Sequence, residues 1–162
     1  MTTVLVTKDY ILADRLVDYG GTVKELAKLH KHKNKFVFYT GERVLDTEFW
    51  KISITAAIEE YLDEDKRQKV EPLLADLFEK ERIFDQIVIF TARETHWLTL
   101  AADKFKTFVI NKNAVWATGS GGGFARAAWA TGISEKKIMP LVGSIDPSSS
   151  TTYDLFYRKG LR

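Results

Sequence analysis

Two short stretches at the start of the chain are mostly hydrophobic and are interrupted by polar residues. Thr3–Thr7 and Tyr10–Val17 are rich in β-branched and aromatic residues, and two polar residues separate them. This pattern predicts a tight β-hairpin. The next stretch, residues 22–35, is rich in Lys and His, and Lys35–Thr40 predicts a further strand.

Apolar residues recur at helical spacing in the middle of the chain. Residues 47–63 predict an amphipathic helix, and the apolar positions between Val70 and Phe78 predict a second one. The charged run Asp63–Lys69 separates them as a break, so Pro72 is expected in the first turn of the second helix, where a missing N–H costs little. Two sequential helices with a short connection are expected to pack as an antiparallel pair.

The second half of the chain predicts strands, two helices and a final strand. Four strand patterns come first: Gln86–Ala92, His96–Ala101, Lys106–Asn111 and Ala114–Thr118. The glycine run Gly119–Gly123 then opens an alanine-rich helix, and Ser134 is placed to cap another. Pro140 lies inside this last helix and predicts a kink or a displaced start. Thr151–Tyr157 predicts the last strand. Runs of strands alternating with paired helices are typical of α+β layers.

Composition limits the possible functions. A chain of 162 residues is expected to form a single domain over residues 1–162, and 24 basic against 22 acidic residues do not indicate a nucleic-acid partner. The chain has no cysteine, which removes thiol catalysis and fits a reducing compartment. No apolar run is long enough to cross a membrane, and the start lacks the order of a signal peptide. We therefore expect a cytoplasmic protein.

The first residues carry a possible nucleophile. If Met1 is removed, Thr2 presents a hydroxyl and a free α-amine on one Cα. An α-amine titrates near pH ~8, so the pair combines a nucleophile with a built-in general base. The alternative is that Thr2 is an ordinary strand residue.

Four short motifs occur in a characteristic order along the chain: Thr2-Thr3-Val4, Ala13-Asp14-Arg15, Gly119-Ser120-Gly121-Gly122 and Asp146-x-x-Ser149. In this order, and with the predicted elements between them, they resemble the proteasome β-subunit and HslV peptidase family. The resemblance covers nearly the whole chain. It implies an α+β fold, the four-layer α-β-β-α sandwich of the N-terminal-nucleophile hydrolases, assembled into rings.

The resemblance also assigns roles to single residues. Thr2 would be the nucleophile, and Asp14 would be the buried carboxylate that pairs with a catalytic lysine. Lys28, followed by Leu29, best matches that lysine. The basic stretch offers five candidates altogether: Lys24, Lys28, Lys31, Lys33 and Lys35. The alternative for Asp14 is a surface carboxylate paired with Arg15.

The remaining assignments lie far along the sequence from Thr2. Ser120 would hydrogen-bond the amine of the nucleophile, and Asp146 and Ser149 would orient the site. Turn formation explains all three equally well from local sequence. Gly41 stands where the family places an oxyanion-hole N–H, but Glu42-Arg43 follow it instead of small residues, a departure that puts the oxyanion hole or the adjacent pocket in doubt.

These motifs lead to two hypotheses. The first is a threonine peptidase that cleaves unfolded polypeptides inside a homo-oligomeric ring, with no metal or organic cofactor and with an ATP-driven unfoldase as the implied partner. The second is a catalytically inactive structural or binding subunit of the same fold, because a retained Met1 would acylate the Thr2 amine. A metal site at His30-x-His32 is disfavoured by the adjacent lysines, and the basic stretch is read as a solvated face.

Overall fold

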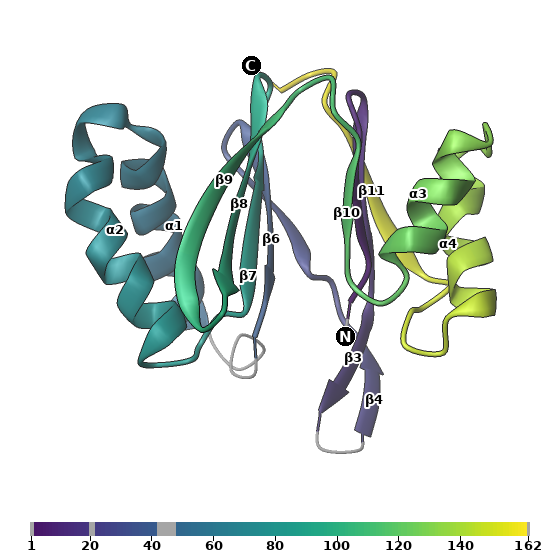
Figure 1. Cartoon of the computed structure of the whole chain (residues 1–162), viewed down its shortest axis with the longest axis horizontal. Coiled ribbons are helices and arrows are strands. Elements are labelled where there is room, and N and C mark those ends of the chain that lie inside the picture. The colour runs from purple at the N-terminus through teal and green to yellow at the C-terminus, as the bar shows by residue number, and fades with distance from the viewer. Residues whose placement is uncertain (1, 20–21, 42–47, 162) are drawn as a thin grey trace. The chain divides into compact units, whose positions relative to one another are not determined.

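The structure is a computed structural model that describes residues 2–19, 22–41 and 48–161. These residues form strands β1–β11 and helices α1–α4 (Figure 1). Strands in runs and helices in pairs confirm the α+β class. The chain divides into two compact units, of which the first comprises residues 1–38, 89–96 and 109–162, and the second comprises residues 39–88 and 97–108. Each unit is described by itself.

The first unit is built on a four-stranded antiparallel sheet with the strand order β10-β1-β2-β11. Its strands are β1 (Val4–Val6), β2 (Tyr10–Asp14), β10 (Trp116–Thr118) and β11 (Tyr153–Tyr157). Val4 lies opposite Ala13 on one side and opposite Thr118 on the other. The predicted N-terminal hairpin is therefore confirmed, and its first strand is central in the sheet.

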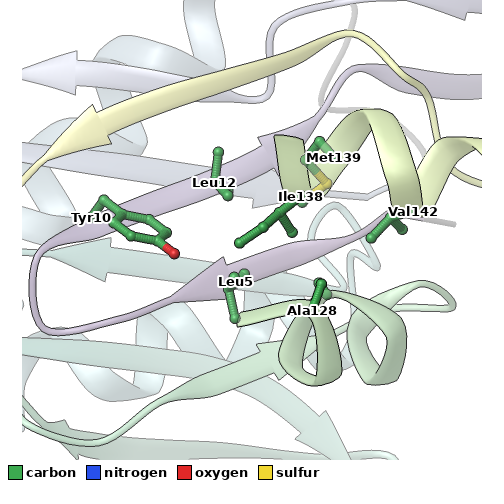
Figure 2. Close-up of a cluster of buried hydrophobic side chains, with 8 residues drawn as sticks. Leu5, Tyr10, Leu12, Ala128, Ile138, Met139 and Val142 are labelled. Carbon is green, nitrogen blue, oxygen red and sulfur yellow. The ribbon is translucent and has the colours of Figure 1, made fainter. Parts of the chain in front are cut away.

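Helices α3 (Gly122–Ala130) and α4 (Glu135–Ile145) pack against this sheet (Figure 1). Their apolar faces close over inward-pointing side chains of β1 and β2, as Figure 2 shows for a cluster that contains Leu5, Tyr10, Leu12, Ala128, Ile138, Met139 and Val142. Full burial of one aliphatic side chain contributes about 1.5–3 kcal/mol. This cluster therefore holds the start of β1 firmly in the unit.

Helix α4 runs through Pro140 without a displaced start. Proline lacks the N–H that would bond the carbonyl four residues earlier, which belongs to Lys136. The hydroxyl of Tyr153 donates to that carbonyl at 3.0 Å. The lost helical bond is thus replaced from β11, which explains why the proline is tolerated. Ser134 is the N-cap residue as predicted, although its side chain makes no capping hydrogen bond.

The basic stretch over residues 22–35 contains strands that its composition did not reveal. The predicted strand Tyr10–Val17 ends at Asp14, and the chain continues as β3 (Leu16–Tyr19), which pairs with β4 (Thr22–Glu25) in a separate two-stranded sheet. Strand β5 (Leu29–His32) then pairs antiparallel with β6 (Lys35–Thr40). The stretch is rich in Lys and His, so pairing between strands outweighs the low strand propensity of Lys.

Helices α1 (Glu48–Leu62) and α2 (Glu64–Glu79) contact each other in the second unit. The expected break at Asp63–Lys69 is wrong, because Asp63 is the N-cap and its side chain accepts from the Asp65 N–H at 3.0 Å. Pro72 consequently lies inside α2 rather than in its first turn. Pro72 and Gln68 are both exposed, so water is available to the carbonyl that Pro72 leaves without a partner.

The remaining strands are β7 (Gln86–Phe90), β8 (Glu94–Ala101) and β9 (Lys104–Asn111). With β5 and β6 they form a five-stranded sheet in the order β5-β6-β7-β8-β9. In the second unit the ring of Phe78 on α2 lies 5.0 Å from that of Phe105 on β9, centroid to centroid. None of the helices described is long and apolar enough to cross a membrane.

Candidate active site

Thr2 lies just before β1 and is almost fully buried. Its Oγ1 accepts a hydrogen bond from the Nζ of Lys28 at 2.6 Å. Lys28 is also buried, in the short connection between β4 and β5. Among the five lysines of the basic stretch, Lys24, Lys31 and Lys33 are exposed and Lys35 bonds Asn34 at 3.1 Å. The structure thus brings Lys28 to Thr2.

Asp14 ends β2 and has no exposed surface. Its carboxylate lies 3.2 Å from Lys28 Nζ and accepts three main-chain N–H groups, from Thr3 at 2.9 Å, Leu16 at 3.3 Å and Ser150 at 3.1 Å. A surface pairing with Arg15 is excluded, because Asp14 is buried and Arg15 instead bonds Asp154 at 2.5 Å. Four donors therefore fix the position of the Asp14 carboxylate beside Lys28.

Burial lowers the pKa of the Lys28 ammonium from its usual 10.5, and the charge and hydrogen bond of Asp14 oppose this effect. A buried lysine paired with a buried carboxylate adds little net stability, because both groups lose their hydration. Perturbed titratable groups of this kind concentrate at functional sites. The pair is therefore a candidate for chemistry at the Thr2 hydroxyl.

The glycine run approaches Thr2 from the other side. Gly119 has a φ of +91°, and a Cβ on it would lie 1.4 Å from the main-chain oxygen of Thr2. Only glycine satisfies both the backbone conformation and this close approach. The turn before α3 is consequently packed directly on the backbone of Thr2.

Ser120, Asp146 and Ser149 form one hydrogen-bonded cluster. The hydroxyls of Ser120 and Ser149 each donate to Asp146 Oδ2 at 2.7 Å, and the Ser148 N–H donates to Oδ1 at 3.1 Å. Burial alone would raise the pKa of Asp146, but these three bonds outweigh it and hold the pKa below 3.8. The structure thus joins residues that the sequence only placed in separate turns.

Thr3 connects this cluster to Asp14, a link that the sequence analysis did not identify. Its N–H donates to Asp14, while its Oγ1 lies 2.7 Å from Ser149 Oγ and accepts the Gly121 N–H at 2.9 Å. Thr3 is fully buried. The only sequence signal for it is a second hydroxyl residue directly after Thr2 in an otherwise apolar strand.

Gly41 belongs to the second unit. A Cβ at this position would lie 1.9 Å from the main-chain oxygen of Ile83, so close packing within that unit already accounts for a glycine here. Its assignment to an oxyanion hole stays a prediction. Glu42 and Arg43 lie outside the described residues.

Within residues 2–19, 22–41 and 48–161, no group of three His, Asp or Glu side chains is placed to hold a metal ion. His30 and His32 lie on β5, the strand that follows Lys28.

No protein-family model and no curated protein sequence matches the chain. Solved structures do match it. The eukaryotic HslV from Trypanosoma brucei is 20% identical in sequence, with a TM-score of 0.65 over 96% of this chain and 98% of its own. Thiobacillus denitrificans BPH is 17% identical, with a TM-score of 0.61 over 97% of each chain. Its complex with epoxomicin is 16% identical by alignment, with a TM-score of 0.60 over 97% of each chain.

These similarities extend over almost the full length of both partners, which agrees with the order of elements expected from the sequence. At this level of identity they establish the fold. The chain therefore has the fold of the HslV and BPH structures, which agrees with the α+β fold that the four sequence motifs implied.

Proposed function

We propose that the chain is a threonine peptidase in which Thr2, freed by removal of Met1, is the nucleophile. The observation that carries the proposal is the buried Lys28 Nζ, 2.6 Å from Thr2 Oγ1 and 3.2 Å from Asp14. An ordinary strand threonine has no need of a buried ammonium on its hydroxyl. Nucleophile, base and orienting group within hydrogen-bond reach are the usual signature of covalent catalysis.

The reaction follows from these groups. Thr2 Oγ1 forms a bond to the carbonyl carbon of the substrate, and its proton passes to the Thr2 α-amine directly or through a water. The C–N bond then breaks, the proton goes to the departing amine, and an ester to Thr2 remains. A water, deprotonated by the same α-amine, hydrolyses the ester and restores the hydroxyl.

Lys28 and Asp14 act on the first step. The Lys28 ammonium stabilises negative charge as it develops on Oγ1, and its positive charge favours the neutral, proton-accepting form of the Thr2 amine. Asp14 fixes the position of Lys28 through their ion pair. Because three main-chain N–H groups also hold Asp14, the pair is rigid before substrate arrives.

The Ser120–Asp146–Ser149 cluster supports the amine side of the nucleophile in this proposal. Its carboxylate stays charged at neutral pH, because its pKa lies below 3.8. A fixed negative charge there favours the protonated amine that forms during attack.

We extend the proposal to assembly and substrate. Large apolar side chains are exposed on α3 and α4, namely Phe124, Trp129, Leu141 and Ile145. Burial of such side chains against further copies of the chain fits a homo-oligomeric ring. Unfolded polypeptides as substrates, an ATP-dependent unfoldase as partner and a cytoplasmic location follow from the family resemblance. Light scattering on the purified protein tests the ring, since a monomer would give a mass of about 18.5 kDa.

A second candidate function is a catalytically inactive subunit. It is favoured by Glu42-Arg43, which follow the proposed oxyanion residue in place of small residues. It also applies to any mature chain that keeps Met1, because Met1 blocks the Thr2 amine. This alternative keeps the fold and the assembly but removes turnover. The two candidates therefore differ in the mass of the mature chain and in peptide cleavage.

The deciding experiment compares Thr2→Ala and Thr2→Ser with the parent chain after Met1 removal has been verified by intact mass. Hydrolysis of fluorogenic peptides should disappear in Thr2→Ala and persist, at a reduced rate, in Thr2→Ser. Circular dichroism and thermal unfolding should be nearly unchanged in both. Undiminished turnover by Thr2→Ala would exclude Thr2 as the nucleophile.

A further inference from the structure

The two halves of the site meet at a residue that has no assigned role. Thr3 bonds Asp14 through its main-chain N–H, and it bonds Ser149 and Gly121 through its hydroxyl. Its side chain is fully buried and lies at the start of β1, next to Thr2. Each side-chain contact reaches a segment more than 100 residues away, with separations of 118 and 146 positions.

The direction of each hydrogen bond is fixed by the chemistry of the partners. The carboxylate of Asp146 only accepts, so the single hydroxyl proton of Ser149 is used in their 2.7 Å bond. The Thr3 hydroxyl must then donate to Ser149 Oγ at 2.7 Å, while its oxygen accepts the Gly121 N–H. The Thr3 hydroxyl therefore donates to Ser149, and the Ser149 hydroxyl donates to Asp146, so both hydroxyl protons are used.

The hydrogen bond from the Gly121 N–H to Thr3 Oγ1 connects this network to the turn beside Thr2. Gly121 lies two residues after Gly119, whose Cα rests against the main-chain carbonyl of Thr2. A Cβ on Gly121 would lie only 2.4 Å from Thr3 Oγ1, so the turn packs closely on Thr3 and has no space for a larger residue here. Holding Gly121 in place therefore also holds the turn that packs on Thr2.

We infer that Thr3 is a positioning residue for the reaction, whose hydroxyl aligns the backbone of Thr2 with Lys28 by locking the Gly119–Gly121 turn and Ser149 to the start of β1. This inference rests on the proposed function for its effect on catalysis. The hydroxyl touches neither substrate nor the reacting atoms, so it acts only through the placement of Thr2. A small displacement of a nucleophile lowers the rate of the chemical step far more than it weakens substrate binding.

The test compares Thr3→Val with Thr3→Ser. Valine keeps the shape of threonine and removes the hydroxyl, whereas serine keeps the hydroxyl and removes the methyl group. We expect Thr3→Val to lower kcat by about tenfold or more with KM changed less than about twofold, and Thr3→Ser to stay within about threefold of the parent in both. An unchanged kcat in Thr3→Val, or equal losses in the two variants, overturns the inference.

A second readout does not depend on activity. The Gly121 amide should exchange with solvent at least about tenfold faster in Thr3→Val than in the parent and keep its protection in Thr3→Ser. The Asp14 amide, which bonds the Thr3 main-chain oxygen at 3.1 Å, serves as the internal reference. Equal Gly121 exchange in Thr3→Val and the parent overturns the inference. If the Met1-free parent is inactive, the proposed function fails, and the amide comparison still decides whether Thr3 locks the turn.

Thr3→Val also leaves the buried Gly121 N–H without an acceptor, which could prevent folding. If Thr3→Val does not fold, Ser149→Ala is tested in its place, because this change removes the acceptor of the Thr3 hydroxyl proton and keeps Thr3 itself. We expect the same pattern, a kcat lowered at least about fivefold with nearly constant KM. A kcat equal to that of the parent overturns the inference.

Discussion

The Nζ atom of Lys28 lies 2.6 Å from the Oγ1 of Thr2, 26 residues away in sequence and with both residues buried. Asp14, at 3.2 Å from the same nitrogen, completes a chain of three buried polar groups. The desolvation of three such groups is costly unless each is paired. Their arrangement at the start of β1 is the physical basis of the account.

Lys28→Met should lower peptide hydrolysis by about 100-fold or more, because it removes the group that stabilises negative charge on the Thr2 oxygen. The fold should survive, since Asp14 keeps its three main-chain donors. Lys31→Met is the matched control, with an exposed lysine three positions further along. Steady-state kinetics and thermal unfolding of both variants test this prediction. Equal activity in the two variants would contradict the role of Lys28.

Gly119→Ala should abolish activity and destabilise the chain by about 2 kcal/mol or more. The new Cβ would clash with the Thr2 main-chain oxygen, and a φ of +91° is strained for alanine. Gly123→Ala is the control, because a Cβ there meets nothing within 4 Å and the residue lies in α3. It should stabilise the chain by about 0.5–1 kcal/mol. Urea unfolding of both variants gives the comparison, and a Gly119→Ala chain of normal stability would argue against the close approach.

Asp146→Asn should change how stability depends on acid. The folded-state pKa of Asp146 lies below 3.8, so between the two values the unfolded chain binds more protons. Its stabilising contribution is complete above pH 3.8 and is lost as the pH falls through the folded-state pKa. At pH 6 the free energy of unfolding of the parent should exceed that of the variant by about 1–2 kcal/mol, and this difference should disappear in acid. Urea unfolding from pH 6 down to the acid limit of folding measures it, and a difference independent of pH would refute the prediction.

Arg158→Met should destabilise the first unit by about 3 kcal/mol or more, because buried carbonyls would lose their donor. The buried guanidinium donates to the main-chain oxygens of Lys8 at 2.8 Å and Thr91 at 2.5 Å, and lies 3.9 Å from the centroid of the Phe90 ring. Lys159→Met, at the exposed next position, should stay within about 0.5 kcal/mol of the parent. Urea unfolding decides, and similar losses in both variants would mean that the guanidinium is not a structural anchor.

The N-terminal hairpin and the helices α3 and α4 could be predicted because their patterns are local. Tyr10–Ala13 is a short apolar run rich in strand-forming residues, and glycines precede an alanine-rich run at Gly122. Strands β4 and β5 could not be predicted, because their sequences are rich in Lys and their stability depends on pairing with β3 and β6. The start of α2 was missed for a similar reason, since Asp63 acts there as a cap.

The residues of the candidate site were likewise predictable only in part from the sequence. Thr2 and Asp14 belong to motifs that the sequence displays, and the family resemblance favoured Lys28 among five lysines. Burial distinguishes Lys28 from Lys24, Lys31 and Lys33, and the bond to Thr2 distinguishes it from the buried Lys35. Both depend on where β4 and β5 pair. The hydrogen bond between Thr3 and Ser149 joins residues 146 positions apart, so no local sequence pattern predicts it.

The most direct test of the central claim is the intact mass of the purified protein before and after treatment with a peptide epoxyketone, a reagent that needs both the hydroxyl and the free amine of an N-terminal threonine. If Thr2 is the nucleophile, the chain should lack Met1 and gain one inhibitor, with no gain in Thr2→Ala. A chain that lacks Met1 and gains no inhibitor would contradict Thr2 as the nucleophile. A chain that retains Met1 and gains none would contradict the peptidase and favour the inactive subunit.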